Sequence, residues 1–358
     1  MTDVIRKIGW PRLIISLFLV GLFVACPFVG VNYQFAVNNV IGRFGMNLVL
    51  ILSLVPMIQA GCGLNFGVPV GIVSGAFGAA CSIELTTTSF FGLVSPGSLA
   101  WFSKGLPGIL VAMIIGCAFA CVIGLLYGYI LNRIKGDEMI ISTYVSMAFV
   151  GFMCLFWAKL LPFKNPILIY SYGGDGFRPQ ISLDANWGGV LGDFLKFKIG
   201  SIVEIPVGMF LFGALCCFAM WLFFRSKLGT AMTAAGSNPE YARAAGVNVD
   251  KMRLISVVMS TAIAALGMIV YYQQYTFVQF YMTPINLMLP TVAAILIGGA
   301  GLKKASISNV VIGTFLFQGI ITVGPLVAGS AFNDIADALR LVISNGMILY
   351  ALTRKEHR

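Results

Sequence analysis

The sequence predicts an all-α polytopic membrane protein with about ten transmembrane helices. Two features of the composition indicate this class: 59% of the residues are hydrophobic and only 10% are charged, whereas globular domains carry roughly 25% charged residues. Several apolar runs also reach the length of about 20 residues that a helix needs to cross a bilayer. The net charge of +10 is expected from cytoplasmic loops, which collect Lys and Arg, and it does not indicate nucleic-acid binding.

Every basic cluster falls on the cytoplasmic side if the chain has ten spans and both termini lie inside. Arg6, Lys7 and Arg12 precede the first span, and the basic tail follows the last one. The first apolar run has no clear cleavage site and is expected to be retained. The spans are expected at about residues 12–29, 45–60, 61–85, 106–132, 139–161, 202–224, 252–272, 286–301, 305–328 and 334–352.

Four polar segments are expected on the outer side. Residues 30–45 contain several amides and the single charge of Arg43, and residues 86–104 are rich in Thr, Ser, Gly and Pro. The longest insertion, 162–200, mixes charges of both signs without a basic excess, which fits an outer loop. The last outer link, 273–286, contains a break at Pro284.

The third span begins with an unusual stretch, Gly61–Gly75, which holds five glycines and Pro69. These residues disfavour a straight helix, and broken backbone at membrane depth is tolerated only inside protein or beside a wet cavity. We therefore expect a broken or closely packed helix beside a pathway. The alternative is that the glycines only allow neighbouring helices to approach closely.

Residues 225–253 form a basic, cytoplasmic stretch between two apolar runs, and they encode a short helix of their own. Asn238 is suited to the N-cap, Pro239 to the first helical position, and Glu240 to the positive end of the helix dipole. Gly246 can adopt the left-handed conformation that ends a helix. We expect about two turns from Pro239 to Ala245, either as a surface for another protein or as an ordinary helical loop.

The spans also suggest two inverted halves within one permease-like domain of residues 1–358, at about 45–161 and 252–352. Blocks five spans apart have opposite orientation, and each contains a Gly-rich interruption, 61–75 in one and 298–301 in the other. Paired interruptions in inverted halves indicate a transport pathway at their interface.

Most site chemistry is absent from the sequence. It contains no Gly-x-x-x-x-Gly-Lys-Ser/Thr nucleotide motif, its single histidine is His357 in the tail, and its eight cysteines show no metal spacing. The carboxylates within spans are Glu84, Asp334 and Asp337, of which Asp337 can pair with Arg340 three residues later, as a structural salt bridge or in transport. No cofactor or metal is expected in this chain.

Three sequence segments resemble one family. Gly236-x-Asn238-x-x-x-Ala242-x-x-x-Gly246-Val247-x-Val249 resembles the cytoplasmic coupling loop of ABC importer permeases of the branched-chain amino acid, ribose and nucleoside type. Asn65-Phe-Gly-Val68 and Asp137-Glu138-Met-Ile-Ile-Ser142 resemble spans 3 and 5 of its nucleoside and simple-sugar branch. The chain departs from that branch at Pro69, where Glu is usual, at Ser142, where Thr is, and at Ser146, where Asn is.

This resemblance implies a permease of the bacterial inner membrane that has no nucleotide site of its own. It implies pairing with a second permease chain, identical or related, and with two ABC ATPase domains that bind ATP and Mg. It also implies delivery of solute by an extracytoplasmic binding protein. Helix-in-groove contact with the ATPases is expected from the coupling residues Asn238, Pro239, Glu240, Tyr241, Arg243 and Gly246.

The expected solute is small and polar, with a sugar or nucleoside favoured over a branched-chain amino acid. The pathway candidates are polar groups at membrane depth, each of which has a helix–helix hydrogen bond as its alternative role: Asn65, Ser74, Ser142, Ser146 and Gln318. An autonomous secondary carrier explains the spans equally well but does not explain the capped helix at 239–245. A membrane-embedded enzyme lacks a catalytic constellation.

Overall fold

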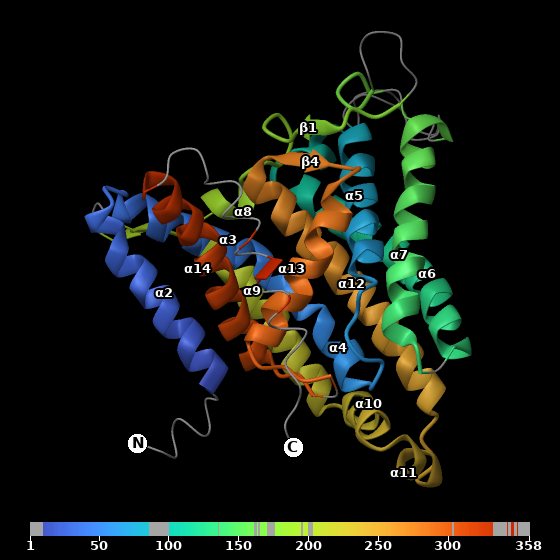
Figure 1. Ribbon diagram of the computed structural model, residues 1–358. Coiled ribbons are helices and arrows are strands. Elements are labelled where there is room, and N and C mark those ends of the chain that lie inside the picture. Colours follow the sequence, from blue (N-terminus) through green and yellow to red (C-terminus); the bar gives the residue numbers. More distant parts are fainter. Residues whose placement is uncertain are drawn as a thin grey trace.

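Long helices of opposite direction form the body of the protein in this computed structural model (Figure 1). It describes residues 10–85, 100–134, 136–160, 163, 165–169, 176–194, 196–199, 203–302, 304–331 and four single later positions. The helices are α2 Trp10–Phe28, α3 Tyr33–Leu52, α4 Leu54–Gln59, α5 Val68–Glu84, α6 Gly105–Arg133, α7 Glu138–Leu155, α8 Val190–Asp193, α9 Val207–Arg225, α10 Lys227–Ser237, α11 Pro239–Ala244, α12 Val249–Tyr275, α13 Thr283–Ile297 and α14 Ile307–Ala331.

Six helical segments among the described residues are long and apolar enough to cross a membrane, which identifies a multi-pass membrane protein. They are Tyr33–Gln59, Gly105–Arg133, Glu138–Lys159, Val207–Arg225, Val249–Tyr275 and Ile307–Gly329. Three shorter apolar helices, Arg12–Phe28, Val68–Glu84 and Thr283–Ile297, accompany them. Most of the predicted tenth span, the pair Asp337 and Arg340, the tail with His357, and residues 86–99 of an outer loop lie outside the described residues.

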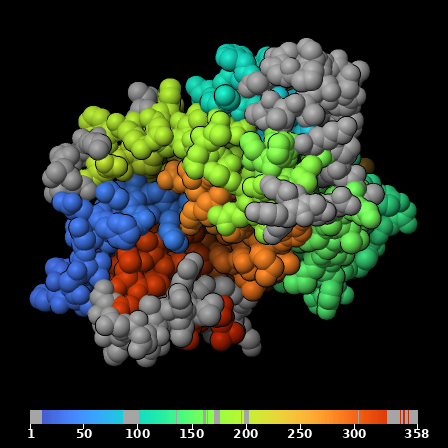
Figure 2. Space-filling model, turned by 90° about the horizontal axis from the view of Figure 1, so that it is seen from above, coloured from blue at the N-terminus to red at the C-terminus, as the bar shows by residue number. Residues whose placement is uncertain are grey.

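The two ends of the bundle differ in structure. At one end, here called the β end, β1 (Gln180–Ser182) pairs with β4 (Phe277–Gln279), and β2 (Lys196–Ile199) pairs with β3 (Val203–Pro206). The short helices α10 and α11 lie at the opposite end, here called the α11 end (Figure 1). Seen from above in Figure 2, the yellow-green segment that follows α7 covers part of the β end.

Helix α5 is the most deeply enclosed element, and its glycines explain why. All of its residues except Phe77 are buried. A Cβ on Gly71 would lie 2.4 Å from the Cβ of Ala264, and one on Gly75 would lie 2.7 Å from the carbonyl oxygen of Ala265. Helix α12 therefore approaches the backbone of α5 directly, as the close-packing alternative requires.

The break in the third span is shorter than the sequence suggested. It covers Gly61–Gly67, whereas the helix from Val68 onward is continuous. The expectation that the interruption extends to Gly75 was wrong, because Pro69 stands in the first turn of α5, where a missing N–H costs nothing.

The expected start of the second span at about residue 45 was also wrong, because α3 already begins at Tyr33. The amides that suggested a loop stabilise the helix. The Oδ1 of Asn32 accepts hydrogen bonds from the backbone N–H groups of Gln34 (2.9 Å) and Phe35 (3.4 Å), and Asn39 donates to the carbonyl oxygen of Phe35 (3.0 Å). Similarly, α13 begins at Thr283 rather than at residue 286, with Pro284 in its first turn.

Candidate functional site

The short helix predicted at 239–245 is present as α11, and its caps are those the sequence indicated. The Oδ1 of Asn238 accepts a hydrogen bond from the backbone N–H of Tyr241 (3.1 Å). Pro239 occupies the first turn, Glu240 is its acidic residue, and Gly246 follows with φ +82°. The adjoining helix α10, Lys227–Ser237, was not predicted.

Helix α11 has one anchored side and one free side. Ala242 is buried among apolar side chains that include Met57 of α4 and Val249 of α12. Glu240 and Arg243 are exposed, and Tyr241 is 70% exposed. The helix, which lies at the α11 end (Figure 1), is thus fixed to the bundle and exposes a tyrosine and two opposite charges.

Helix α10 touches the interruption before α5 through a backbone contact between two glycines. A Cβ on Gly236 would lie 2.1 Å from the carbonyl oxygen of Gln59, and one on Gly61, which has φ +72°, would lie 2.9 Å from the Cα of Gly236. No side chain fits between the two segments. The backbone of α10 therefore lies directly against Gly61 and the end of α4.

Asn65 organises the Gly61–Gly67 segment. Its Oδ1 accepts hydrogen bonds from the backbone N–H of Gly67 (2.7 Å) and from the hydroxyl of Tyr127 (3.1 Å). Its Nδ2 donates to the hydroxyl of Ser260 on α12 (2.8 Å). The hydroxyl of Ser146 donates to the carbonyl oxygen of Phe66 (3.1 Å). This Asn65 network joins α5, α6, α7 and α12.

Of the other pathway candidates, Ser142 borders this network through the hydroxyl of Tyr127, whereas Ser74 and Gln318 lie outside it. Ser142 is one turn before Ser146 and donates to the carbonyl oxygen of Met139 (2.8 Å). Ser74 is two turns into α5 and donates to the carbonyl oxygen of Val70 (2.8 Å). Gln318 belongs to α14, which packs against α3, α13 and α2. All five candidates are buried in this conformation.

Tyr127 and Ser260 belong to the Asn65 network but were not predicted. Tyr127 lies between Gly124 and Gly128 of α6, both of which pack closely against α12. Ser256, Ser260 and Thr261 are buried hydroxyls on α12. A run of buried hydroxyls at helical spacing was the available signal, but it does not reveal the partner across the bundle.

An ion pair fixes the neighbouring helix ends. Arg253 of α12 and Glu138 of α7 bind each other with side-chain exposures of 10% and 17%. Nearby, the side chain of Asn132 on α6 donates to the carbonyl oxygen of Asp250 (2.8 Å). These contacts hold the first turn of α12, which follows α11 in the chain, against α6 and α7.

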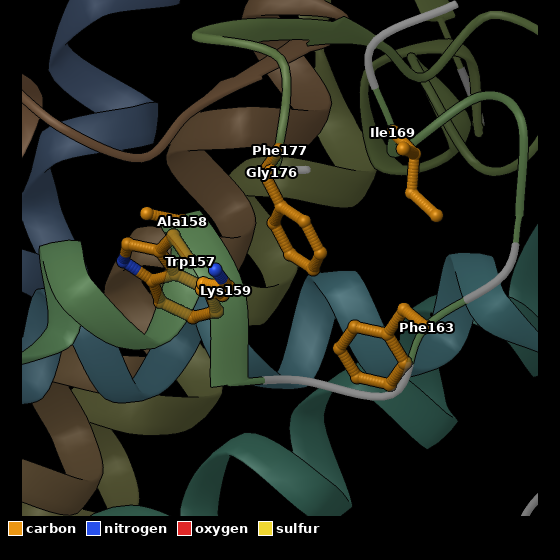
Figure 3. Close-up of a pocket in the computed structure, with 7 residues that line it drawn as sticks. All are labelled: Trp157, Ala158, Lys159, Phe163, Ile169, Gly176 and Phe177. Carbon is orange, nitrogen blue, oxygen red and sulfur yellow. The ribbon is translucent and has the colours of Figure 1, made fainter. Parts of the chain in front are cut away.

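A small pocket of about 260 Å³ lies where α7 ends in a π-helical turn, Phe156–Leu160 (Figure 3). The ring of Phe177 stacks against Trp157 (5.4 Å between centroids) and against Phe163 (5.5 Å), and Lys159 contributes a cation. No pathway candidate lines this pocket. Within the described ranges, no group of three His, Cys, Asp or Glu side chains could hold a metal ion.

Comparison with known families identifies the class of protein. The sequence profile of the family described as "Branched-chain amino acid transport system / permease component" matches residues 36–352. The chain belongs to this permease family. The match includes α11, the Asn65 network and all described helices from α4 onward, and it confirms the resemblance that the sequence motifs indicated.

Several curated proteins are similar to this permease. The nucleoside ABC transporter permease protein NupB of Lactococcus lactis is 26% identical over 57% of this chain and 56% of its own length. The xylose/arabinose import permease protein XylH of Sulfolobus acidocaldarius is 28% identical over 59% of this chain and 51% of its own length. The ribose import permease protein RbsC of Escherichia coli is 21% identical over 72% of this chain and 75% of its own length. The chain thus matches about half the length of the first two, and no solved structure matches it.

Proposed function

We propose that this permease forms the membrane pathway of an ATP-binding-cassette importer for a small polar solute, a sugar or nucleoside rather than a branched-chain amino acid. The observation that carries the proposal is α11, a capped helix anchored by Ala242 that presents Glu240, Tyr241 and Arg243, in a chain of a permease family. One of two ATPase domains would bind α11 in a groove, with Asn238, Pro239 and Gly246 fixing the shape of the helix. A second permease chain and an extracytoplasmic binding protein would complete the importer.

The coupling route follows from the contacts. ATP-driven closure of the ATPases would move α10 and α11 together, and the contact of Gly236 with Gly61 would carry this motion to the Asn65 network. The pathway residues Asn65, Ser74, Ser142, Ser146 and Gln318 are buried here, so they would meet solute only after the helices rearrange. The aromatic pocket would offer a stacking surface to a ring entering from the β end.

Two inverted halves, at about 45–161 and 252–352, remain part of the proposal. In support, each half contains a short apolar helix that adjoins non-helical glycines: α5 follows residues 61–67, and α13 precedes residues 298–301. The side chain of Gln59 also donates to the carbonyl oxygen of Ala305, which joins the two regions. The ten spans and a bacterial inner-membrane location belong to the same proposal.

The test is purification of the chain from native membranes in mild detergent, with identification of the proteins that co-purify. We expect a stoichiometric Walker-A ATPase, which Glu240→Lys with Arg243→Glu should remove by reversing both exposed charges. The matched control reverses the exposed ion pair at the β end, Asp193→Lys with Lys196→Asp, and should keep the ATPase. A chain that purifies alone and moves solute in liposomes without ATP would establish an autonomous carrier instead.

A further inference from the structure

The corrected start of α3 places Arg43 inside a membrane-spanning segment rather than in an outer loop. The apolar segment Tyr33–Gln59 has 27 residues, whereas about 20 are needed to cross the hydrocarbon core. Counted back from Gln59 at the α11 end, 20 residues reach Val40, so Arg43 falls within the core, in the half nearer the β end. Charged side chains at such depth are rare, and they usually mark a functional site.

Arg43 shares a face of α3 with buried residues. Residues three and four positions away share one face of a helix, and here Val40 is 2%, Met46 2% and Asn47 4% exposed. Arg43 itself is only partly buried. A partly accessible cation on an otherwise enclosed face, at membrane depth, indicates a polar space within the protein rather than contact with lipid.

Among the described residues, the neighbours of Arg43 on α3 include two amides and no carboxylate. Asn39 and Asn47 flank it at four residues on either side, and the Nδ2 of Asn47 donates to its carbonyl oxygen (2.9 Å). The ion pairs recorded between described residues do not include Arg43.

Carboxylates are scarce on the elements around α3. Within the described residues of α2, α4, α9, α12, α13 and α14, the only carboxylate is Asp250, which stands in the first turn of α12 at the α11 end. The backbone N–H of Glu204 in β3 donates a hydrogen bond to the Oδ1 of Asn38 (3.0 Å). Asn38 lies five residues before Arg43 and so on a different face of α3.

We propose that Arg43 binds the anionic oxygen-acid group, a carboxylate or a phosphate, of the solute that this permease moves. A guanidinium is costly to bury unpaired, and its planar fork matches both acid groups. The inference rests on the proposed transport function and narrows its solute to an acidic derivative of a small polar molecule. The acid group would be captured in the β-end half of the pathway.

The test uses the full chain in nanodiscs of zwitterionic lipid and compares probes that differ in an acid group. Thermal unfolding is followed with D-glucuronate against D-glucose, and with ribose 5-phosphate against ribose. We expect at least one acid, and neither neutral sugar, to raise the unfolding temperature. Arg43→Gln should weaken its apparent affinity about tenfold or more, as expected for loss of a charged hydrogen bond, and Arg43→Lys should retain part of it.

Two further arms make each outcome decisive. Arg133→Gln removes a cation at the opposite end of the bundle and should leave the acid effect unchanged. An effect that appears only when anionic phospholipid is added would assign Arg43 to a lipid phosphate and overturn the solute proposal. Equal shifts with acid and neutral probes, no shift with either acid, or an unchanged response in Arg43→Gln would also overturn it. None of these readouts depends on co-purification of an ATPase, so the two proposals fail independently.

Discussion

Several polar residues that the sequence predicted to line the pathway are buried and bonded within the protein. Asn65 was selected as a solute contact, yet its side chain is fully buried and bonds Gly67, Tyr127 and Ser260. Ser74 and Ser142 likewise bond carbonyl oxygens of their own helices. An amide at membrane depth needs partners wherever it points, so its presence in a span could not distinguish a pathway group from a structural one.

Gly246 carries a prediction at the residue scale, because its φ of +82° rather than its surroundings requires glycine. A Cβ at this position would meet nothing within 4 Å, so a substitution of Gly246 tests backbone strain without steric clashes. Gly246→Val should cost about 1–2 kcal/mol, the penalty for a left-handed residue with a Cβ, and should reduce ATP-coupled uptake. Unfolding midpoints and uptake are the measurements.

The matched control for Gly246 is Gly246→Asn, since asparagine tolerates the left-handed conformation better than other residues. It should stay close to wild type in stability and in uptake. If the valine and asparagine variants behaved alike, the conformation of residue 246 would not be what shapes the end of α11.

Local sequence signals predicted which helices form better than they predicted which helices contact one another. The caps of α11 are read from adjacent residues, so the sequence located that helix to within one residue at its end. The contact of α10 with Gly61, and the buried cluster that contains both Ala242 of α11 and Met57 of α4, join segments far apart in the chain. Such contacts depend on how α4 and α12 pack, which the hydrophobic pattern of each span does not specify.

The Arg253–Glu138 pair carries the prediction at the scale of helices, because it joins α12 to α7 with little exposure. Arg253→Met alone should destabilise the protein by about 1–3 kcal/mol, since it leaves a partly buried carboxylate without its partner. The double variant Arg253→Met/Glu138→Leu should lose less than the sum of the two single variants. Equilibrium unfolding in mixed micelles, arranged as a double-mutant cycle, measures this difference.

Strictly additive losses in that cycle would mean that the two side chains contribute independently. The swapped pair Arg253→Glu/Glu138→Arg provides a second measurement. Partial recovery relative to either single swap is expected if attraction between the charges holds the helices together.

The whole molecule is built around α12, which packs against α6, α5 and α3. Its first turn is tied to α6 by Asn132 and to α7 by Arg253, and its last residues lead into β4 at the β end. A movement of α11 at one end of α12 therefore acts on a helix that contacts most of the bundle. This arrangement suits a permease that must open first to one side of the membrane and then to the other.

Sidedness is the prediction at this scale. Tyr241 (70% exposed) marks the α11 end, and Phe197 (61% exposed) marks the β end. A membrane-impermeant maleimide applied to intact cells should label Phe197→Cys but not Tyr241→Cys, and inverted vesicles should show the reverse. The positive-inside rule is the reason, since the loop that holds α11 is basic.

Wild type is the control for labelling, because the described native cysteines are buried or partly buried and should react little. The reverse labelling pattern would place α11 outside the cell, where no ATPase could reach it. That result would contradict the proposed coupling role even if the family assignment stands.

The sequence by itself determined the class of protein, most of its apolar helices and the capped helix α11. These features follow from composition and from residues adjacent in the chain, which are printed in the sequence. It misplaced the start of α3, because Asn32 and Asn39 can bond either water in a loop or the backbone of a helix.

Only the tertiary structure decided which groups meet. Tyr127 lies 62 residues from Asn65, and Ser260 lies 195 residues from it, yet one side chain binds both. The contact between Gly61 and Gly236, and the burial of the neighbours of Arg43 on α3, likewise depend on the packing of helices from distant parts of the chain. Within a membrane such packing is set by shape and by hydrogen bonding rather than by hydrophobicity, so a hydropathy pattern that locates the helices cannot pair them.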